Sequence, residues 1–210
     1  RARAGQTART PILLGTMRDD GSITAANLTS LEMFIQTLGP GGTALTPDEL
    51  RAVYPNRTDA QILQDAARDD ALTCPEHLFA DALIESGVAS VFRYIYGAVF
   101  ADNQPFPNAG AWHTSELPEL FGTFNHSTAT TAEAELSRTF QTALANFVKD
   151  PTARPAPGWP EYVPGNTSRT LAEIAFHGNV GLDNFVQLVM SDSVDRPCLA
   201  LWDGLRDFNL

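Results

Sequence analysis

Residues 108–123 read Asn108-Ala-Gly-Ala-Trp-His-Thr-Ser-Glu-Leu-Pro-Glu-Leu-Phe-Gly-Thr123, and this stretch decides the fold. His113 stands here among small residues, a carboxylate follows at Glu116, and a Leu-Phe-Gly run, which we expect to be buried, closes the stretch. A histidine in a Gly/Ala-rich loop also fits a purely structural, hydrogen-bonded role. The rest of the chain must decide between that role and a chemical one.

A second segment near the start of the chain ends in acidic residues. Pro11-Ile-Leu-Leu-Gly-Thr16 is a short apolar run closed by a glycine, which predicts a buried strand. Asp19, Asp20 and Gly21 follow it. An acid at the end of a buried strand is where an α/β protein presents functional side chains. The local sequence alone favours an Asx-turn with solvated acids.

Taken together, the two segments resemble the type-B carboxylesterases, the family of cholinesterases and fungal esterases and lipases. The matching residues of the histidine segment are Gly110, His113, Glu116, Leu117, Phe121 and Gly122. The family's acid segment reads Pro-x-Leu-x-Gly-x-x-x-Asp-Glu-Gly, in which the Glu belongs to a catalytic triad. The resemblance therefore implies that His113 is a general base and that Asp20, an Asp in place of Glu, is its acid. Asp19 matches a non-catalytic Asp.

The serine that such a triad requires is missing from this chain. A Ser hydroxyl becomes a good nucleophile only when an imidazole takes its proton and a carboxylate orients that imidazole. α/β-Hydrolases place the Ser first in the chain, on a Gly-x-Ser-x-Gly turn. No Ser here has glycine at both flanking second positions, and no Gly-Gly loop precedes Asp20. We therefore interpret residues 1–210 as the C-terminal portion of a single α/β-hydrolase domain, with a mostly parallel sheet flanked by helices.

The Ser would lie on an N-terminal portion that is not in this sequence. Either that portion is a separate chain of the same precursor, giving a heterodimer, or the sequence is a piece of one longer polypeptide. A strand such as residues 11–16 belongs in the middle of a sheet and would expose an edge if left alone, so we favour the heterodimer.

The resemblance implies hydrolysis of a small ester or lipid without a cofactor. The first rival is a non-catalytic, cholinesterase-like adhesion or binding glycoprotein, since such proteins keep the fold and usually lose triad members. The second is a stand-alone binding module.

Other residues near His113 have weaker assignments. Trp112 and Phe121 could line a substrate pocket, although core packing fits as well. Ser115 and Glu116 resemble a polar pair that supports the histidine loop in the family. The remaining histidines, at positions 77, 126 and 177, have no metal-ligand spacing, so we expect no metal site.

Composition excludes several classes of partner. The net charge of −11 argues against nucleic acid and anionic membrane surfaces, which select for basic patches. No apolar run approaches the roughly 20 residues of a transmembrane helix. Because the sequence has no initiating Met and no hydrophobic leader, we expect a mature chain or a fragment.

Four Asn-x-Ser/Thr sequons predict N-glycosylation and hence a secreted eukaryotic protein, and the family resemblance implies a fungal type. Their asparagines are Asn27, Asn56, Asn125 and Asn166. By resemblance to the cholinesterases, Cys74 and Cys198 would form a disulfide that ties down the C-terminal helix. Two buried free thiols are the alternative.

Local signals also predict the main helices and the central strand. Capping boxes begin helices after Thr46 and Thr58. The β-branched and aromatic run Val88–Tyr96 predicts a central strand. Apolar residues at helical spacing predict a long helix over Thr131–Val148. Weaker patterns predict helical structure over Thr170–Met190 and a C-terminal amphipathic helix that carries Cys198 and Trp202.

Overall fold

The computed structural model of the protein describes residues 2–165, 169–175 and 186–205. In this part of the chain the strands form one sheet in the order β1-β2-β3-β4. Their bounds are Ile12–Met17 (β1), Val91–Tyr96 (β2), Leu171–Ile174 (β3) and Val186–Val189 (β4). β1, β2 and β3 run parallel and β4 runs antiparallel to β3. The expected α/β class with a mostly parallel sheet is therefore confirmed.

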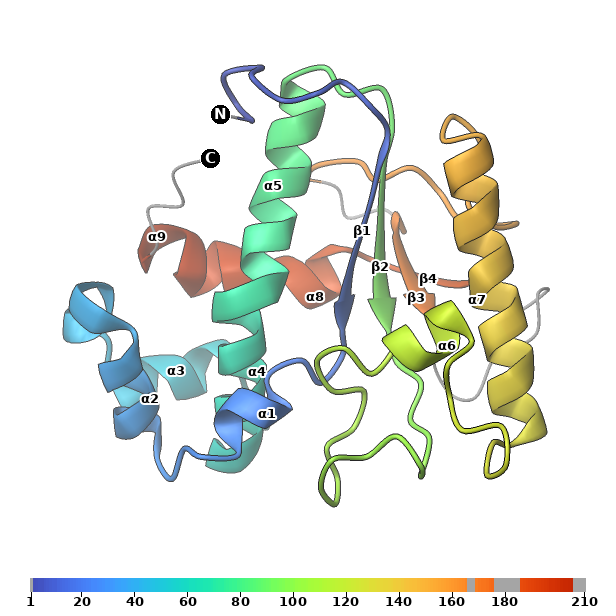
Figure 1. Ribbon diagram of the computed structural model, residues 1–210. Coiled ribbons are helices and arrows are strands. Elements are labelled where there is room, and N and C mark those ends of the chain that lie inside the picture. Colours follow the sequence, from blue (N-terminus) through green and yellow to red (C-terminus); the bar gives the residue numbers. More distant parts are fainter. Residues whose placement is uncertain (1, 166–168, 176–185, 206–210) are drawn as a thin grey trace.

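Helices connect and cover these strands (Figure 1). Their bounds are Ser22–Ala25 (α1), Leu31–Thr37 (α2), Pro47–Val53 (α3), Asp59–Arg68 (α4), Cys74–Glu85 (α5), Leu117–Phe121 (α6), Thr131–Lys149 (α7), Asp192–Pro197 (α8) and Asp203–Leu205 (α9). A 3₁₀ turn at Gly39–Ala44 follows α2, and π-helical turns at Asp69–Thr73 and Cys198–Trp202 lead into α5 and α9. Among the described residues, no helix has both the length and the apolarity to cross a bilayer.

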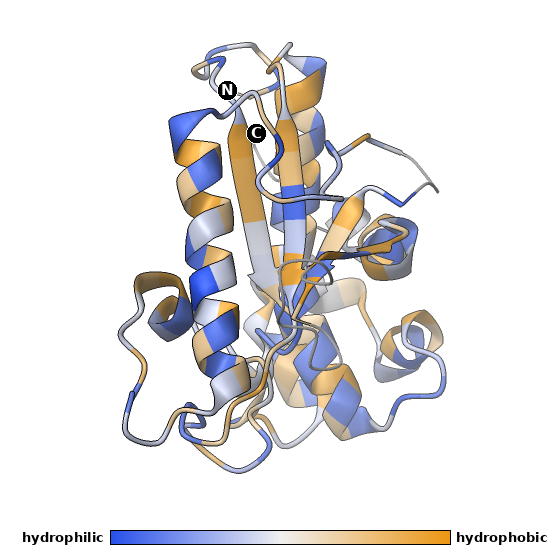
Figure 2. Cartoon of the chain, turned by 90° about the vertical axis from the view of Figure 1, so that its right-hand side faces the viewer, coloured by the Kyte–Doolittle hydropathy of each residue, from blue (hydrophilic) through white to orange (hydrophobic). Residues whose placement is uncertain are grey.

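The central strand β2 is buried on both faces. Phe92, Tyr94 and Tyr96 point to the side of α7, where Tyr94 and Tyr96 pack against Phe140. Val91 points to the opposite side, where it packs with the residues of α5. The alternation follows from the two-residue side-chain period of a strand. Figure 1 shows α5 and α7 on either side of the sheet, and Figure 2 shows both hydrophobic and hydrophilic faces on the flanking helices.

The alternate residue on the α5 side of β2 is a buried charge, Arg93. Its guanidinium donates to both oxygens of Asp195 on α8 at 2.7 and 3.1 Å, and to Glu76 on α5 at 2.9 Å. Asp195 also lies 3.4 Å from Nδ1 of His77. Because removing one partner would leave an uncompensated buried charge, this network fixes α5 and α8 against the sheet.

A separate helical core lies beside the sheet and is joined by a disulfide. α2, α3, α4 and the C-terminal turn bury a shared cluster around Leu50, Ile62 and Trp202. The capping boxes predicted at Thr46 and Thr58 are both present. The predicted bridge is confirmed: Cys74 at the start of α5 is bonded to Cys198, with their Cα atoms 5.2 Å apart.

The prediction of a helix over Thr170–Met190 was wrong for the described residues of that stretch. Leu171–Ile174 (β3) pairs in parallel with β2, and Val186–Val189 (β4) pairs antiparallel with β3. Short apolar runs do not distinguish a strand from a buried helix by periodicity alone. Here the neighbouring strand β2, almost eighty residues away in sequence, supplies the hydrogen-bond partners that decide the conformation.

The expectation that the Leu-Phe-Gly run after His113 is buried was also wrong for Phe121, which is 68% exposed. The inward face of α6 carries Glu119 instead, whose backbone carbonyl accepts hydrogen bonds from Ser137 Oγ at 2.6 Å and Gln141 Nε2 at 3.3 Å on α7. The Glu119 carboxylate is fully buried, and neither oxygen has a hydrogen-bond partner among the described residues. Burial, reinforced by the nearby carboxylate of Glu133, raises the pKa of Glu119 to about 8.

The disulfide should contribute strongly to stability. It closes a loop with a sequence separation of 124 residues, and the chain-entropy estimate for such a loop is about 5 kcal/mol. We expect reduction with dithiothreitol to lower the Tm by about 10–20 °C in calorimetry. A Cys74→Ala/Cys198→Ala variant should show the lower Tm with or without reductant, and equal Tm values for oxidised and reduced wild type would contradict this role.

The buried Glu119 should make stability fall as the pH rises. In the unfolded chain a Glu ionises near pH 4.3, whereas folded Glu119 keeps its proton up to about pH 8. Stabilisation present below the unfolded pKa is therefore lost as the pH approaches 8. We expect the Tm of wild type to decrease as the pH rises from about 4.3 to about 8. The Tm of the Glu119→Gln variant should depend less on pH over the same range. Glu85→Gln, at an exposed position on α5, should follow wild type.

Candidate active site

The acid loop begins where β1 ends, at Met17. One carboxylate oxygen of Asp20 accepts the backbone N–H of Met17 at 2.6 Å, which folds the loop back onto the strand end. Gly21 permits this turn because a Cβ at that position would lie 2.0 Å from the backbone oxygen of Gln64 on α4. The loop is thereby held between the sheet and α4, and the Asp20 side chain is only 2% exposed.

The histidine loop follows β2 and is stabilised by its own amide side chains. The Gln104 side chain accepts a hydrogen bond from the backbone N–H of Gly110 at 3.1 Å and donates one to the Gly110 carbonyl at 3.0 Å. The Asn103 side chain donates a hydrogen bond to the backbone carbonyl of Ser115 at 2.7 Å. The backbone carbonyl of Asn103 accepts a hydrogen bond from the indole N–H of Trp112, also at 2.7 Å. These bonds fix the shape of the loop on both sides of the histidine.

The two loops bring His113 and Asp20 into contact across 93 residues of sequence. Nδ1 of His113 lies 2.9 Å from the Oδ1 atom of Asp20. The His113 side chain is 53% exposed, whereas its carboxylate partner is buried. No hydrogen-bond partner for the second ring nitrogen, Nε2, is found among the described residues. The arrangement can therefore accept a proton at Nε2 while a buried carboxylate orients the ring through Nδ1.

Burial and hydrogen bonding act in opposite directions on Asp20. Its removal from water raises the pKa of the Asp20 carboxyl. The Met17 amide, the His113 ring and the guanidinium of Arg68 oppose this rise. Arg68 also donates to the carbonyl of Arg18 at 3.1 Å and thus holds the acid loop through its backbone.

Ser115 and Glu116, expected to support the histidine loop, do lie beside it. Ser115 is buried, and its backbone carbonyl is the acceptor for Asn103. The Ser115 hydroxyl and one carboxylate oxygen of Glu116 are buried without a hydrogen-bond partner among the described residues. Burial raises the pKa of Glu116. Their supporting role stays a prediction.

The two aromatic residues proposed for a substrate pocket have different surroundings. Trp112 is half-buried, and its indole N–H is used within the loop. Phe121 is exposed at the end of α6, eight positions after the histidine. Both are compatible with contact to a ligand, and neither assignment is tested by these positions.

His77 and His126 have partners outside the dyad. His77 is buried against Tyr162, whose hydroxyl lies 3.2 Å from its Nδ1. His126 is exposed and packs against the ring of Phe124. His177 lies outside the described residues, as does the sequon residue Asn166. Within the described ranges, no group of three or more His, Cys, Asp or Glu residues could hold a metal ion.

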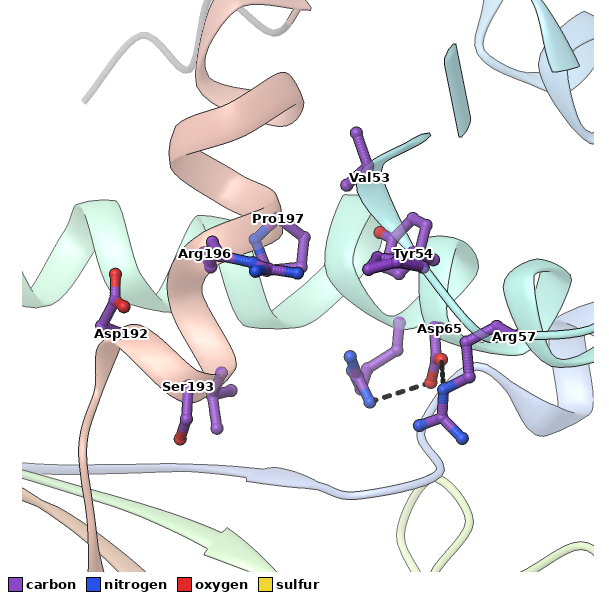
Figure 3. A pocket seen from close by; sticks show the side chains of 11 residues that line it. Val53, Tyr54, Arg57, Asp65, Asp192, Ser193, Arg196 and Pro197 are labelled. Atoms are coloured by element: carbon purple, nitrogen blue, oxygen red, sulfur yellow. Dashed lines mark hydrogen bonds and ion pairs between the residues drawn. The ribbon is translucent and has the colours of Figure 1, made fainter. Parts of the chain in front are cut away.

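A polar hollow of about 340 Å³ lies between α3, α4 and α8 (Figure 3). Its wall includes Arg57 and Arg68, which flank Asp65 at 3.1 and 3.2 Å, with Arg196 on the opposite side. None of its lining residues belongs to the dyad. We therefore assign the site to the exposed His113 and not to this hollow.

Sequence reasoning missed several residues that build the site. Asn103 and Gln104 lie between β2 and the histidine segment and were assigned no role, and Asp19 was matched only to a non-catalytic Asp. Amide side chains just before a Gly-rich segment are a weak sign of a self-bonded loop. The contact of Asp19 with the histidine loop spans over ninety residues and leaves no local signal.

Comparison with known proteins identifies the family of the chain. Residues 49–188, two thirds of the chain, match the carboxylesterase family. Secreted lipase 5 of Gibberella zeae is 35% identical over 74 residues, which cover 34% of this chain and 14% of the relative. Chlorogenic acid esterase of Aspergillus niger is 38% identical over 68 residues, or 31% of this chain and 13% of the relative. The matched segments are thus a small part of both relatives, and on the family match this chain belongs to the carboxylesterase family.

Proposed function

We propose that this chain provides the general base and its orienting acid to a serine carboxylic ester hydrolase. The observation that carries the proposal is the contact of 2.9 Å between the exposed imidazole of His113 and the buried carboxylate of Asp20. The nucleophilic Ser lies on a separate N-terminal chain of the same precursor. Asp20 acts as an Asp variant of the family's usual Glu.

In the first half-reaction, Nε2 of His113 takes the proton of the Ser hydroxyl as its oxygen attacks the ester carbonyl carbon. Asp20 accepts the Nδ1–H bond and thereby stabilises the imidazolium that forms. When the tetrahedral intermediate collapses, the C–O bond to the alcohol breaks and Nε2 returns the proton to the departing alkoxide oxygen. The product at this stage is an acyl-enzyme.

In the second half-reaction, His113 activates a water molecule in the same way. Its Nε2 takes one proton as the water oxygen attacks the acyl carbonyl, and then returns the proton to the Ser oxygen. The carboxylic acid leaves and the Ser is regenerated. Because Nε2 is the ring nitrogen that does not face Asp20, and the ring is half exposed, the His113 side of this chain must face the Ser-bearing chain.

The unpaired edge of β1 supports the proposal of a partner chain. In the described sheet β1 pairs with β2 only, so its other edge offers unpaired backbone groups. An open, mainly apolar hollow of about 460 Å³ adjoins this edge, lined by Leu14, Gly15, Thr16, Ala71, Leu72, Pro75, Glu76 and Phe79. A strand and side chains from the N-terminal chain would cover both features, as our expectation of a central position for residues 11–16 requires.

The substrate class and location rest on the relatives and on exposure. The names of the relatives, a secreted lipase and a chlorogenic acid esterase, support a small ester or lipid substrate and secretion from the cell. Of the sequon asparagines in the described residues, Asn27, Asn56 and Asn125 are all exposed, as glycosylation requires. Nothing in the proposed chemistry requires a cofactor.

Replacement of His113 tests the mechanism directly. In the assembled protein, we expect His113→Ala to lower kcat by about 10⁴-fold or more, because the Ser loses its base. The variant should still fold, since the side chain is half exposed, with a lower Tm because the buried Asp20 carboxylate loses one hydrogen-bond partner. His126→Ala, at another exposed histidine, should retain wild-type kcat. Appreciable ester hydrolysis by His113→Ala would remove this residue from the mechanism.

The partner proposal predicts where association can be weakened. Leu72→Asp places a charge in the hollow beside β1, and we expect it to weaken binding of the N-terminal chain by about tenfold or more. Val148→Asp, on the outer face of α7 where the side chain is 72% exposed, should bind normally. Sedimentation of the assembled protein on dilution would measure the difference.

Intact-mass measurement and fluorophosphonate labelling would identify the Ser-bearing polypeptide itself. We expect two polypeptides in the purified protein, with the label on the N-terminal chain only. A well-folded monomer of this chain without any labelled partner would instead favour the stand-alone binding module.

A further inference from the structure

Asp19, the residue before the proposed acid, joins the two loops of the dyad. Its backbone N–H donates to the carbonyl of Ala111 at 3.0 Å. Its carboxylate oxygen Oδ2 accepts the backbone N–H of Ala111 at 2.8 Å. Both hydrogen bonds therefore connect the same two residues, one immediately before Asp20 and the other two positions before His113.

The backbone of the histidine loop is shaped to admit the Asp19 carboxylate. Gly110 has a φ of +74°, which favours glycine. A Cβ at Gly110 would lie 2.3 Å from Asp19 Oδ2 and 2.6 Å from its Cγ. Glycine is thus required here both for the dihedral angle and for the close approach, and Ala111 is completely buried at the contact.

The other supports of the histidine loop do not reach the acid loop. Asn103 and Gln104 bond only to residues of their own loop. Among the described residues, the Asp19–Ala111 pair and the His113–Asp20 contact are the hydrogen bonds that connect Asp19 or Asp20 to residues 97–116. The position of His113 relative to Asp20 therefore depends on Asp19.

We propose that Asp19 is a positioning residue that holds the histidine loop in register with Asp20, so that the imidazole meets its carboxylate partner. The proposal rests on the proposed function of the dyad. Asp19 does not act on the substrate itself, because its Oδ2 is engaged with the Ala111 amide and with Arg18, whose Nε lies 3.5 Å away. Loss of this hydrogen bond would let the loop shift, and a displacement of about 1 Å at a catalytic group can cost about 100-fold in rate.

Steady-state kinetics of the assembled protein on a short-chain nitrophenyl ester tests the proposal. We expect Asp19→Ala to lower kcat by about 100-fold with little change in KM. Here kcat is expressed per active Ser, which end-point labelling with a fluorophosphonate counts. Asp19→Asn keeps an oxygen that can accept the Ala111 N–H, and should retain kcat within about tenfold of wild type. Asp48→Ala, at an exposed aspartate on α3, should match wild type.

A double-mutant cycle separates positioning from a general loss of stability. If Asp19 acts through the dyad, Asp19→Ala should cost much less in kcat when Asp20→Asn has already removed the acid. The same 100-fold loss in both backgrounds, or an Asp19→Asn variant as slow as Asp19→Ala, would overturn the proposal.

The outcomes also distinguish this inference from the proposed function. Wild-type kcat in Asp19→Ala, together with an inactive His113→Ala, would reject the role of Asp19 alone. Full activity in His113→Ala would reject the proposed function itself.

Discussion

The pairing of β1 with β2 is the constraint on which the site depends. The two strands are parallel, and their register sets Met17 opposite Tyr96. The segments that follow β1 and β2 therefore leave the sheet at the same edge. The N–H of Arg18 extends the pairing by one more bond, to the carbonyl of Tyr96. The acid and the histidine follow these strand ends, in the place where parallel sheets present functional side chains.

That edge also makes the dyad asymmetric. Asp20 is sealed behind the strand end with the Met17 amide and the imidazole as its partners, whereas His113 is half exposed. A buried carboxylate with few partners is costly unless those partners are held in place. The loop contacts around it therefore maintain the geometry of the charged group, and the exposed imidazole leaves one ring nitrogen for a reacting partner. This is the arrangement that the proposed general base and its orienting acid require.

Local signals allowed much of this to be predicted from sequence. The strand at residues 12–17, the capping boxes, the long helix α7 and the central strand each have patterns contained within a few residues. The disulfide and the His113–Asp20 pair came from resemblance to a family, not from spacing. β3 could not be recognised because its conformation is set by pairing with β2. The outward position of Phe121 could not be foreseen because Glu119, a residue type rarely buried, takes the inward face of α6.

The rigidity of the core explains why a single loop contact can matter. Arg93 on β2 is bonded to Glu76 on α5 and to Asp195 on α8, and the Cys74–Cys198 bridge ties the same two helical regions together. Despite burial, the His77 and Arg93 contacts lower the pKa of Asp195, so this carboxylate stays charged. The sheet and α5 thus form a fixed base, and the remaining freedom lies in the loops beyond the strand ends. Since the internal bonds of the histidine loop set its shape but not its place, its alignment with Asp20 must come from a contact between the loops, which Asp19 provides.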